Sequence, residues 1–440
     1  MAAEQIIETM IAQVRGHVQE EIELLVRRES GQSQAKVEQR LEDLMGVIRQ
    51  AVLQAVGQAL GTGYGGSQMP CECGAWMRFV GHRRKTVLTL LGDLHLQRAY
   101  YSCAHCRATR VPLDEQLDIV RQGQSAGVKL VTALTCALLP NAQAMGLLEE
   151  LKLPHVSVKE SQRLTLEVGQ RAIGQRDEEA RRWCEQRVGP GEHVRREAPE
   201  RLAVLMDGTT AHTDGDWHEV KVGTFYTFDE EGKATGEKGH VATFEKIDHF
   251  RSLWDTEAQR WHLGQAPHVV ALCDGAAWTW NIIAQCCPEH TVQILDFYHA
   301  TEHLWTLART LFGEASKRAA RWVDKQKERL LHGRLDDFFC ELKRRTRQPQ
   351  HVDEAGKQLR YFQNNRQRLD YAAAISRGDP IGSGMVEAAC KTLICVREKQ
   401  PGMRWRKDTA DAIAHLRCLY YSARWQRFRQ QTINSSQRAA

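Results

Sequence analysis

The succession of apolar runs beyond Glu200 constrains the fold of this chain most strongly. A strand-like run ending at Met206 is followed by two more strand-like runs, and helical and strand-like runs alternate only after these. The five strand-like runs are LAVLM (202–206), EVKVGTFYTF (219–228), HVATFEKI (240–247), HVVALC (268–273) and TVQIL (291–295). This order predicts one mixed sheet in which the first and fourth strands are neighbours.

Such an order is that of a ribonuclease H-like α/β sheet, which is the fold class that we predict for the catalytic part of the chain. A nearly uninterrupted helical pattern from about 298 to 378 predicts a long helical insertion in it. The domains that we expect are an α-helical N-terminal region (1–62), a small β zinc ribbon (68–120), a helical, helix-turn-helix-like domain (125–195), the ribonuclease H-like domain (200–425) and a tail (426–440).

The first half of the chain has a mostly helical pattern on either side of a β-rich stretch. Residues 4–60 repeat apolar side chains at helical spacing and predict helices, with a helical hairpin as one arrangement. From Ser125 onward, Pro140 and Pro154 separate three helical segments, and Ser157 is placed to cap the last one. These three helices either form a helix-turn-helix-like unit or simply connect the neighbouring domains.

Two aspartates stand where strands of the predicted sheet end. Asp207 follows LAVLM, Asp274 follows HVVALC, and a glycine comes directly after each of them. Because neighbouring strands lie roughly 4.8 Å apart, the two carboxylates can share a pair of metal ions spaced about 4 Å apart. An Asp-Gly step after a strand is also a common turn, which is the alternative for either residue alone.

A third acid, Glu387, lies in the segment GSGMVEAACKTLICVREK, which predicts an amphipathic helix with Ser383 at its start. A helix packed across the strand ends would bring this glutamate to the two aspartates. Taken alone, Glu387 is better explained as a solvated helix acid paired with Lys391 one turn later.

Several motifs together resemble one known family. The chain from about residue 70 to about 425 looks like the ISKra-type bacterial insertion-sequence transposases, relatives of the Mutator-like group. The motifs that carry the resemblance are MDGTT, HEVKVGTFYTF, ALCDGAAWTWN, QILDFYHATEHLW, YFQNNRQRLDYA and PIGSGMVEAACK.

The resemblance implies a catalytic triad of Asp207, Asp274 and Glu387, the DDE triad of that family. It also matches Asp296 and His299 to a Cys or Asp, two residues, then His motif of the Mutator-like group, which places these residues, with His303, near the active site. The long helical stretch before Glu387 resembles the insertion of such transposases. The Thr209-Thr210 pair is a departure at a position that varies among relatives.

The activity implied is metal-dependent cleavage and joining of DNA. Three carboxylates are hard oxygen ligands that favour Mg²⁺, or Mn²⁺, and the two ions would serve in-line phosphoryl transfer without a covalent protein–DNA intermediate. The partners expected are double-stranded DNA, as transposon ends and as target, and further copies of the chain, because two DNA ends must be paired.

A rival metal motif overlaps the same region. His299, Glu302 and His303 spell H-x-x-E-H, the arrangement of inverzincin peptidases, with two histidines one helical turn apart. A short motif without its structural context is weak, and this interpretation leaves the two Asp-Gly strand ends unused. We therefore keep a zinc peptidase only as a lesser alternative.

Four of the thirteen cysteines form two closely spaced pairs. Cys71 and Cys73 precede a β-rich stretch, and Cys103 and Cys106 follow it, which suits a tetrahedral, structural Zn²⁺ site of the zinc-ribbon kind. The first pair is one residue shorter than the usual C-x-x-C. Four buried thiols are the alternative. The ribbon also carries a basic cluster from Arg78 to Lys85, which could touch phosphate or be merely solvated.

Basic residues gather in two stretches although the formal net charge is only +5. The first stretch runs from Lys317 to Arg347 in predicted helices, and a solvated helix face is its alternative interpretation. The second lies near Glu387, and we expect it to bind DNA because cations and an aromatic ring next to a metal site suit backbone contact and base stacking. Its members are Arg397, Lys399, Arg404, Trp405, Arg406 and Lys407.

The N-terminus MAAEQIIETM carries acid where a signal peptide has positive charge, and no stretch reaches about 18 uninterrupted apolar residues. We therefore expect a cytoplasmic, nucleoid-associated bacterial protein without a membrane partner. Two other functions stay open at this stage: a zinc-ribbon DNA-binding protein without catalysis, and a transposase that has lost its activity. Metal-dependent nicking of DNA separates both from an active transposase.

Overall fold

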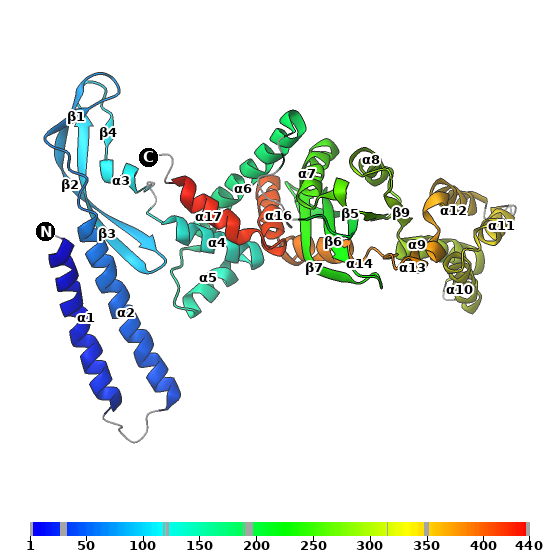
Figure 1. Cartoon of the computed structure of the whole chain (residues 1–440), viewed down its shortest axis with the longest axis horizontal. Helices are drawn as coiled ribbons and strands as arrows, with labels where there is room; N and C mark the ends of the chain where they lie inside the picture. The colour runs from blue at the N-terminus through cyan, green and yellow to red at the C-terminus, as the bar shows by residue number, and fades with distance from the viewer. Residues whose placement is uncertain are drawn as a thin grey trace. The chain divides into compact units, whose positions relative to one another are not determined.

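A computed structural model gives the three-dimensional structure of the chain (Figure 1). It describes residues 3–26, 33–117, 119, 123–187, 189, 197–314, 316–346 and 352–436. The chain divides into two compact units, one made of Met1–Val168 with Arg427–Ala440 and the other of Gly169–Gln426. Among the described helices, none is long and apolar enough to cross a membrane.

The first unit opens with two long helices, α1 (Ala3–Val26) and α2 (Gln34–Ala59), which lie side by side in Figure 1. The helical prediction for residues 4–60 agrees with these two helices, and residues 27–32 lie outside the described part of the chain. The pairing is held by modest burial, since Ile7 and Met45 keep about half of their surface exposed, 50% and 51%.

A four-stranded antiparallel sheet follows, with strands in the order β1 (Gln68–Pro70), β2 (Trp76–Thr89), β3 (Gly92–Cys103) and β4 (Thr109–Arg110). Its small core contains Met77, Ala99 and Tyr101. The β2–β3 turn is formed by Leu90 and Leu91, because Thr89 pairs with Gly92 across the hairpin. Helix α3 (Pro112–Gln116) continues from β4.

Three helices come next, as predicted: α4 (Ala126–Leu138), α5 (Asn141–Glu150) and α6 (Val158–Gln186). Serine side chains cap the N-termini of two of these helices. The Ser125 hydroxyl accepts from the backbone N–H of Val128, and the Ser157 hydroxyl accepts from that of Glu160. The predicted tail is also helical over α17 (Trp425–Ser436); residues 437–440 lie outside the described part.

The second unit is built on a five-stranded sheet in the order β7-β6-β5-β8-β9. Strands β5 and β6 and strands β6 and β7 are antiparallel, whereas β8 is parallel to both β5 and β9. The predicted neighbourhood of the first and fourth strands is therefore confirmed. The strand bounds are β5 (Arg201–Thr213), β6 (Asp216–Phe228), β7 (Ala234–Thr243), β8 (His268–Cys273) and β9 (Val292–Leu295).

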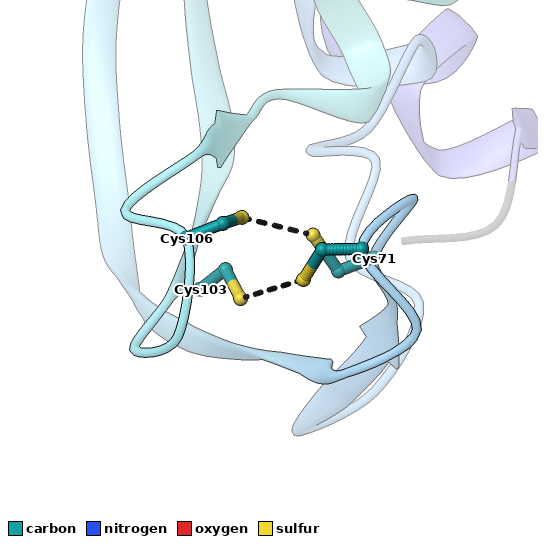
Figure 2. A group of neighbouring side chains, drawn as sticks. Cys71, Cys103 and Cys106 are labelled. Atoms are coloured by element: carbon teal, nitrogen blue, oxygen red, sulfur yellow. Dashed lines mark hydrogen bonds between the residues drawn. The ribbon is translucent and has the colours of Figure 1, made fainter.

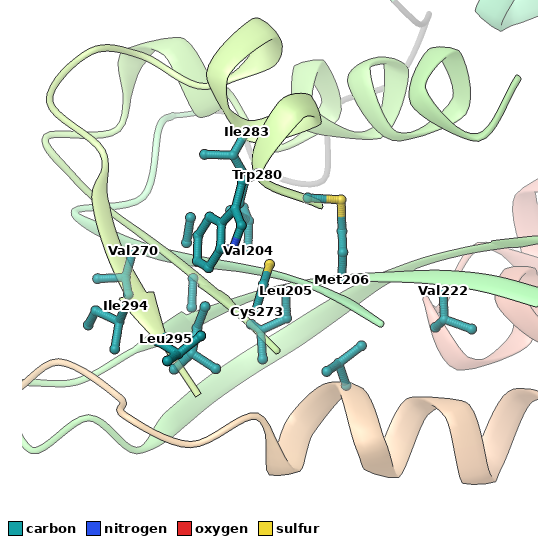
Figure 3. Packing of buried hydrophobic residues seen from close by; sticks show 14 of the residues in the cluster. Val204, Leu205, Met206, Val222, Val270, Cys273, Trp280, Ile283, Ile294 and Leu295 are labelled. Atoms are coloured by element: carbon teal, nitrogen blue, oxygen red, sulfur yellow. The ribbon is translucent and has the colours of Figure 1, made fainter. Parts of the chain in front are cut away.

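The core of this unit lies against the two faces of the sheet. Val204 and Leu205 on β5 and Val270 on β8 are completely buried, because the central strands are covered on both sides. Trp280 and Ile283 reach the same cluster from α8 (Ala277–Cys286), as Figure 3 shows. Helix α7 (Ile247–Arg260) adds further large side chains, and the short 3-10 turn Leu263–Gln265 leads into β8.

A run of helices separates β9 from the segment that carries Glu387, in agreement with the predicted helical stretch. Its helices are α9 (Phe297–Phe312), α10 (Lys317–Leu331), α11 (Leu335–Thr346), α12 (Val352–Asn364), the 3-10 turn Arg366–Arg368 and α13 (Tyr371–Ser376). The chain then returns to the sheet, where the backbone N–H of Phe297 donates to the carbonyl of Ile381 at 2.9 Å.

The segment predicted as one amphipathic helix is interrupted. Helix α14 (Gly384–Cys390) passes into a π-helical turn, Lys391–Cys395, and then into α15 (Val396–Glu398). A π-helical turn inserts an extra residue and rotates the next helical segment, and such turns are frequent at functional sites. After a loop, α16 (Lys407–Tyr421) packs on the sheet at β7.

Candidate functional site

Three aspartates occupy matching positions at one edge of the five-stranded sheet. Met206 pairs with Cys273, and Cys273 pairs with Leu295, in parallel register. Asp207, Asp274 and Asp296 are the next residues along these three strands. The register therefore brings together the two acids singled out in the sequence and adds a third acid beside them. Only Asp274 and Asp296 follow the last residue of their strands. Strand β5 continues to Thr213 in a hairpin with β6, so the prediction that Asp207 ends its strand is wrong.

Asp207 is half-buried and lies in a negative environment. Burial raises the pKa of its carboxyl, and the charges of Asp274 and Glu387 raise it further, while a hydrogen bond from the backbone N–H of Gly208 acts in the opposite direction. The thiol of Cys390 on α14 donates to Asp207 Oδ2 at 3.6 Å. Asp207 is thus repelled by Asp274, which follows the neighbouring strand β8, and by Glu387 on α14.

Asp274 is held in a tight turn. Its Oδ1 accepts from the backbone N–H of Ala276 at 2.9 Å, and Gly275 adopts a φ of +101°, which favours glycine. From α12, the hydroxyl of Tyr361 donates to the backbone carbonyl of Asp274 at 2.8 Å. Sequence reasoning missed Tyr361, because no local pattern links it to residue 274.

Glu387 and Asp296 are joined through Ser383. The Ser383 hydroxyl lies 2.7 Å from Glu387 Oε1 and 2.7 Å from Asp296 Oδ2. Asp296 is buried, and its carboxylate also accepts from the backbone N–H groups of Tyr298 and His299, which begin α9. Asp296 is therefore close to the candidate site, as the sequence suggested, but its oxygens are taken up by hydrogen bonds that hold two helix starts.

A cation would relieve the repulsion at this edge of the sheet. Among the described residues, the charged groups that act most on Asp207 are the carboxylates of Asp274 and Glu387, with no lysine or arginine among these main influences. In a compact metal site, the ligand atoms would all lie within 4.8 Å of one another. Within the described part of the chain, the oxygens of the three acids are not gathered this closely. Their hard oxygen donors suit Mg²⁺ or Mn²⁺ chemically. If two ions bind, the carboxylate oxygens would be divided between them and need not all lie close together.

In the H-x-x-E-H motif, His303 contacts residues of α12, and His299 contacts Glu302 of the motif itself. His303 stacks on Tyr361 with ring centroids 3.6 Å apart, and its Nδ1 lies 2.7 Å from Gln358 Oε1. His299 Nδ1 lies 3.5 Å from Glu302 Oε2. Burial lowers the pKa of His303. Within the described residues these three side chains form no group that could hold a metal, so the geometry offers the peptidase hypothesis no support.

The four cysteines of the first unit form the group whose ligand atoms do lie within 4.8 Å of one another. Sγ of Cys71 is 3.5 Å from Sγ of Cys106, and Sγ of Cys73 is 3.7 Å from Sγ of Cys103 (Figure 2). Tetrahedral Zn²⁺ with Zn–S bonds of about 2.3 Å requires S···S separations of this order. This group could bind a metal ion such as zinc.

The backbone around Cys103 favours a thiolate at that residue. The backbone N–H groups of Cys106 and His105 lower the pKa of the Cys103 thiol to about 6, together with the thiols of Cys106 and Cys73. Against backbone hydrogen bonds that lower them, burial and the neighbouring thiols raise the pKa values of Cys71, to about 12, and of Cys106. Each pair sits in a tight turn, with Gly74 and Arg107 at positive φ, +83° and +61°. A thiolate is the form that binds a metal ion.

The basic residues expected to contact DNA differ in their exposure. Lys399, Arg404 and Arg406 are exposed, while Trp405 and Lys407 are half-buried. Arg397 is only 1% exposed, and its guanidinium lies over the Trp405 ring at 4.7 Å. The prediction that Arg397 contacts DNA does not fit this burial: its charge is used inside the protein.

Three of these residues face the hairpin of β5 and β6. Lys399 Nζ donates to Thr209 Oγ1 at 2.8 Å, two residues from Asp207. The backbone N–H of Lys407 donates to Asp214 Oδ2 at 3.2 Å, and the carbonyl of Trp405 accepts from the backbone N–H of Asp214. The loop after α15 is thus fixed along the hairpin.

An exposed aromatic residue that the sequence did not single out lies at the same place. Trp217 is 60% exposed and meets His212 edge-to-face, with ring centroids 5.6 Å apart. Trp217, Lys399 and Arg404 line one pocket of about 680 Å³. The sequence signal nearest to Trp217 is the Asp214-Gly215 turn, which predicts the tip of a hairpin but not the residues that pack against it.

The first basic stretch is mostly solvent-exposed. Lys317, Arg318, Arg321 and Lys325 on α10 are exposed. On α11, Arg344 and Arg345 pair with Glu341 at 2.7 and 2.9 Å; Arg347 lies outside the described residues. Part of this stretch is therefore neutralised by its own helix.

No protein-family model matches the chain, and no curated protein is detectably similar to it in sequence.

Proposed function

We propose that this chain is a metal-dependent DNA transposase whose catalytic acids are Asp207, Asp274 and Glu387. The observation that carries the proposal is the register of β5 and β8, which sets Asp207 beside Asp274, together with the electrostatic influence of Asp274 and Glu387 on Asp207. The strand order β7-β6-β5-β8-β9 supports a ribonuclease H-like catalytic domain. The family resemblance supplies the third acid.

In this proposal Asp207 and Asp274 bind two divalent cations, Mg²⁺ or Mn²⁺, and Glu387 completes the ligand set. When bound, such ions activate a water or a DNA 3′-hydroxyl and stabilise the leaving oxygen in in-line phosphoryl transfer. The residues themselves hold fixed positions: the Gly275 turn and Tyr361 orient Asp274, and the Gly208 N–H and Cys390 thiol orient Asp207.

DNA would lie across the strand ends and the hairpin of β5 and β6. Lys399 and Arg404 offer exposed positive charge for phosphates beside Asp207, and Trp217 offers an exposed ring for an unpaired base. The zinc ribbon around Cys71–Cys106 supplies a second basic surface, with Arg78 and Arg84 exposed.

The decisive experiment compares wild type with Asp207→Asn and Asp274→Asn. The substrates are labelled duplexes copied from the DNA that flanks the chain's own gene, with Mg²⁺ or Mn²⁺. We expect wild type to nick and join these duplexes, and either variant to lose at least about 10³-fold in rate while binding the duplexes within a factor of about three. Asp248→Asn, on an exposed acid of α7, is the matched control and should nick normally.

Normal nicking by Asp207→Asn would sink the proposal. Specific duplex binding without any nicking by wild type would instead favour a zinc-ribbon DNA-binding protein, for which the cysteine group is the supporting observation, or a transposase that has lost its activity.

A further inference from the structure

Ser383 occupies the capping position of α14 without capping it. Its φ and ψ are −78° and 7°, and its side chain accepts no hydrogen bond from the first turn of the helix. The residue is 6% exposed. Its hydroxyl is instead directed to two carboxylates, Asp296 Oδ2 and Glu387 Oε1, each at 2.7 Å. A capping serine ordinarily stabilises its helix, so this side chain is diverted from the usual role.

Asp296 fixes Ser383 from the sheet side. Besides the hydroxyl, its carboxylate accepts from the backbone N–H groups of Tyr298, His299 and Ser383, at 3.1, 3.1 and 3.0 Å. The backbone N–H of Asp296 donates to the carbonyl of Cys273, the residue before Asp274. A buried carboxylate with three backbone donors is rigidly held, so Ser383 is tied to the strand edge that carries Asp274.

Glu387, by contrast, is an exposed side chain. A free glutamate samples several rotamers and loses that freedom when it binds a metal ion. Ser383, Glu387 and Cys390 follow one another at i, i+4 and i+7, so they lie on one face of α14, and Cys390 contacts Asp207. The Ser383 contact therefore selects a Glu387 rotamer on the face that meets Asp207.

We propose that Ser383 is a positioning residue: anchored by Asp296, it orients the Glu387 carboxylate toward the metal site formed with Asp207 and Asp274. The inference rests on the proposed function, because it assumes that Glu387 is a metal ligand. A serine hydroxyl carries one hydrogen and donates to one carboxylate at a time, and Asp296 keeps its three backbone donors in either case. Residues that orient metal ligands in this way typically change metal affinity or activity about 10- to 100-fold.

The test measures Mn²⁺ binding to the DNA-free protein by electron paramagnetic resonance, and the Mn²⁺ dependence of DNA nicking. For Ser383→Ala we expect Mn²⁺ affinity to fall about 10-fold or more. The half-saturating Mn²⁺ concentration for nicking should rise by the same factor, with kcat at saturating Mn²⁺ within about threefold of wild type. Ser383→Thr keeps the hydroxyl and should restore both quantities.

Two further variants separate positioning from simple stability. Ser316→Ala removes a serine that does cap its helix, α10, and should lower the melting temperature without moving the Mn²⁺ affinity. In a Glu387→Ala background, adding Ser383→Ala should change Mn²⁺ affinity no further, because the ligand that it orients is gone. Should Ser383→Ala fail to fold, Ser383→Cys takes its place, since its longer and weaker S–H donor predicts the same loss.

Unchanged Mn²⁺ affinity in a folded Ser383→Ala protein would overturn the inference and leave the proposed function standing. An additive effect in the Glu387→Ala background would overturn it as well. If wild type and Asp207→Asn bind Mn²⁺ equally weakly, the metal site itself is wrong and the proposed function fails first.

Discussion

The hydroxyl of Tyr361 donates a hydrogen bond to the backbone carbonyl of Asp274 at 2.8 Å. Tyr361 comes from α12, far along the chain from β8, and the ring also stacks on His303 of α9. A Cβ on Gly275 would meet this ring at 3.0 Å. The helical stretch between β9 and α14 therefore braces the turn that carries one of the proposed catalytic acids.

Tyr361→Phe should loosen that turn without removing the ring. We expect a loss of about 0.5 to 1.5 kcal/mol in unfolding free energy, the usual contribution of one hydrogen bond, and a several-fold drop in DNA nicking. Urea unfolding and the nicking rate check the two parts. Tyr420→Phe, on an exposed tyrosine of α16, is the control and should change neither; equal nicking by Tyr361→Phe and wild type would show that the brace has no functional effect.

The raised pKa of Asp207 has a defined sign for stability. Because the folded protein holds the proton more tightly than the unfolded chain, the group favours folding at low pH, and this advantage is lost as pH rises from the ordinary aspartate value of about 3.9. At pH 7 the metal-free carboxylate therefore destabilises the fold. Asp207→Asn should melt a few degrees higher than wild type at pH 7 and show little difference near pH 4.

Melting curves with and without Mn²⁺ complete that comparison. Added Mn²⁺ should stabilise wild type by mass action and leave Asp207→Asn unchanged. A variant that melts lower than wild type at pH 7, with Asp248→Asn unchanged, would mean that Asp207 is stabilised by its neighbours and not repelled by them.

The cysteine group should hold one metal ion per chain. Because the pKa of Cys103 is lowered to about 6, its thiolate is present at neutral pH, and its contribution to metal binding is lost as pH falls through about 6. Colorimetric titration of released zinc at pH 7.5 and pH 5 measures this. Cys103→Ser should abolish the bound zinc, while Cys340→Ser, on an exposed cysteine, should retain it; equal zinc content in both would contradict a site at Cys103.

Exposure separates the cations that should bind DNA. Lys399→Ala and Arg404→Ala should each weaken duplex binding and reduce the slope of log affinity against log salt by roughly 1. Arg397→Ala should instead destabilise the protein, because its buried guanidinium packs on Trp405. Fluorescence anisotropy at several salt concentrations, with melting temperatures, distinguishes the two kinds of effect, and a normal salt slope for both Lys399→Ala and Arg404→Ala would exclude this loop from the DNA path.

Trp217 should contribute through its ring. Trp217→Ala is expected to weaken binding to duplexes with a single-stranded end by about 10-fold, since stacking of one base contributes about 1 to 3 kcal/mol. Trp217→Phe should recover part of the loss, and binding to blunt duplexes should change less. Equal losses of affinity for duplexes with single-stranded and with blunt ends would mean that Trp217 contacts DNA without stacking on an unpaired base.

The sequence predicts the features that depend on local pattern. The order of strands and helices and the position of Asp274 directly after β8 derive from apolar runs and turn residues, and the structure agrees with them. Ser157 is recognisable as a helix start because capping uses residues three positions apart. These features need no knowledge of distant contacts.

The remaining features depend on contacts that no local pattern encodes. The sequence predicts Ser383 at a helix start, yet Asp296, 87 residues away in the chain, takes its hydroxyl. It predicts that Arg397 contacts DNA because the residue belongs to a basic stretch near Glu387, but the guanidinium is buried over the aromatic face of Trp405. Tyr361 and Trp217 gain their positions only from tertiary packing.

The hydrogen bond between Phe297 N and Ile381 O holds the two ends of the long helical stretch together at the sheet. Changes of length in the loops of this stretch would leave its two ends in place, as long as Tyr361 keeps its hydrogen bond to Asp274. Differences in length among kindred chains should therefore collect between residues 298 and 380, while the spacing from Ile381 to Glu387 stays constant.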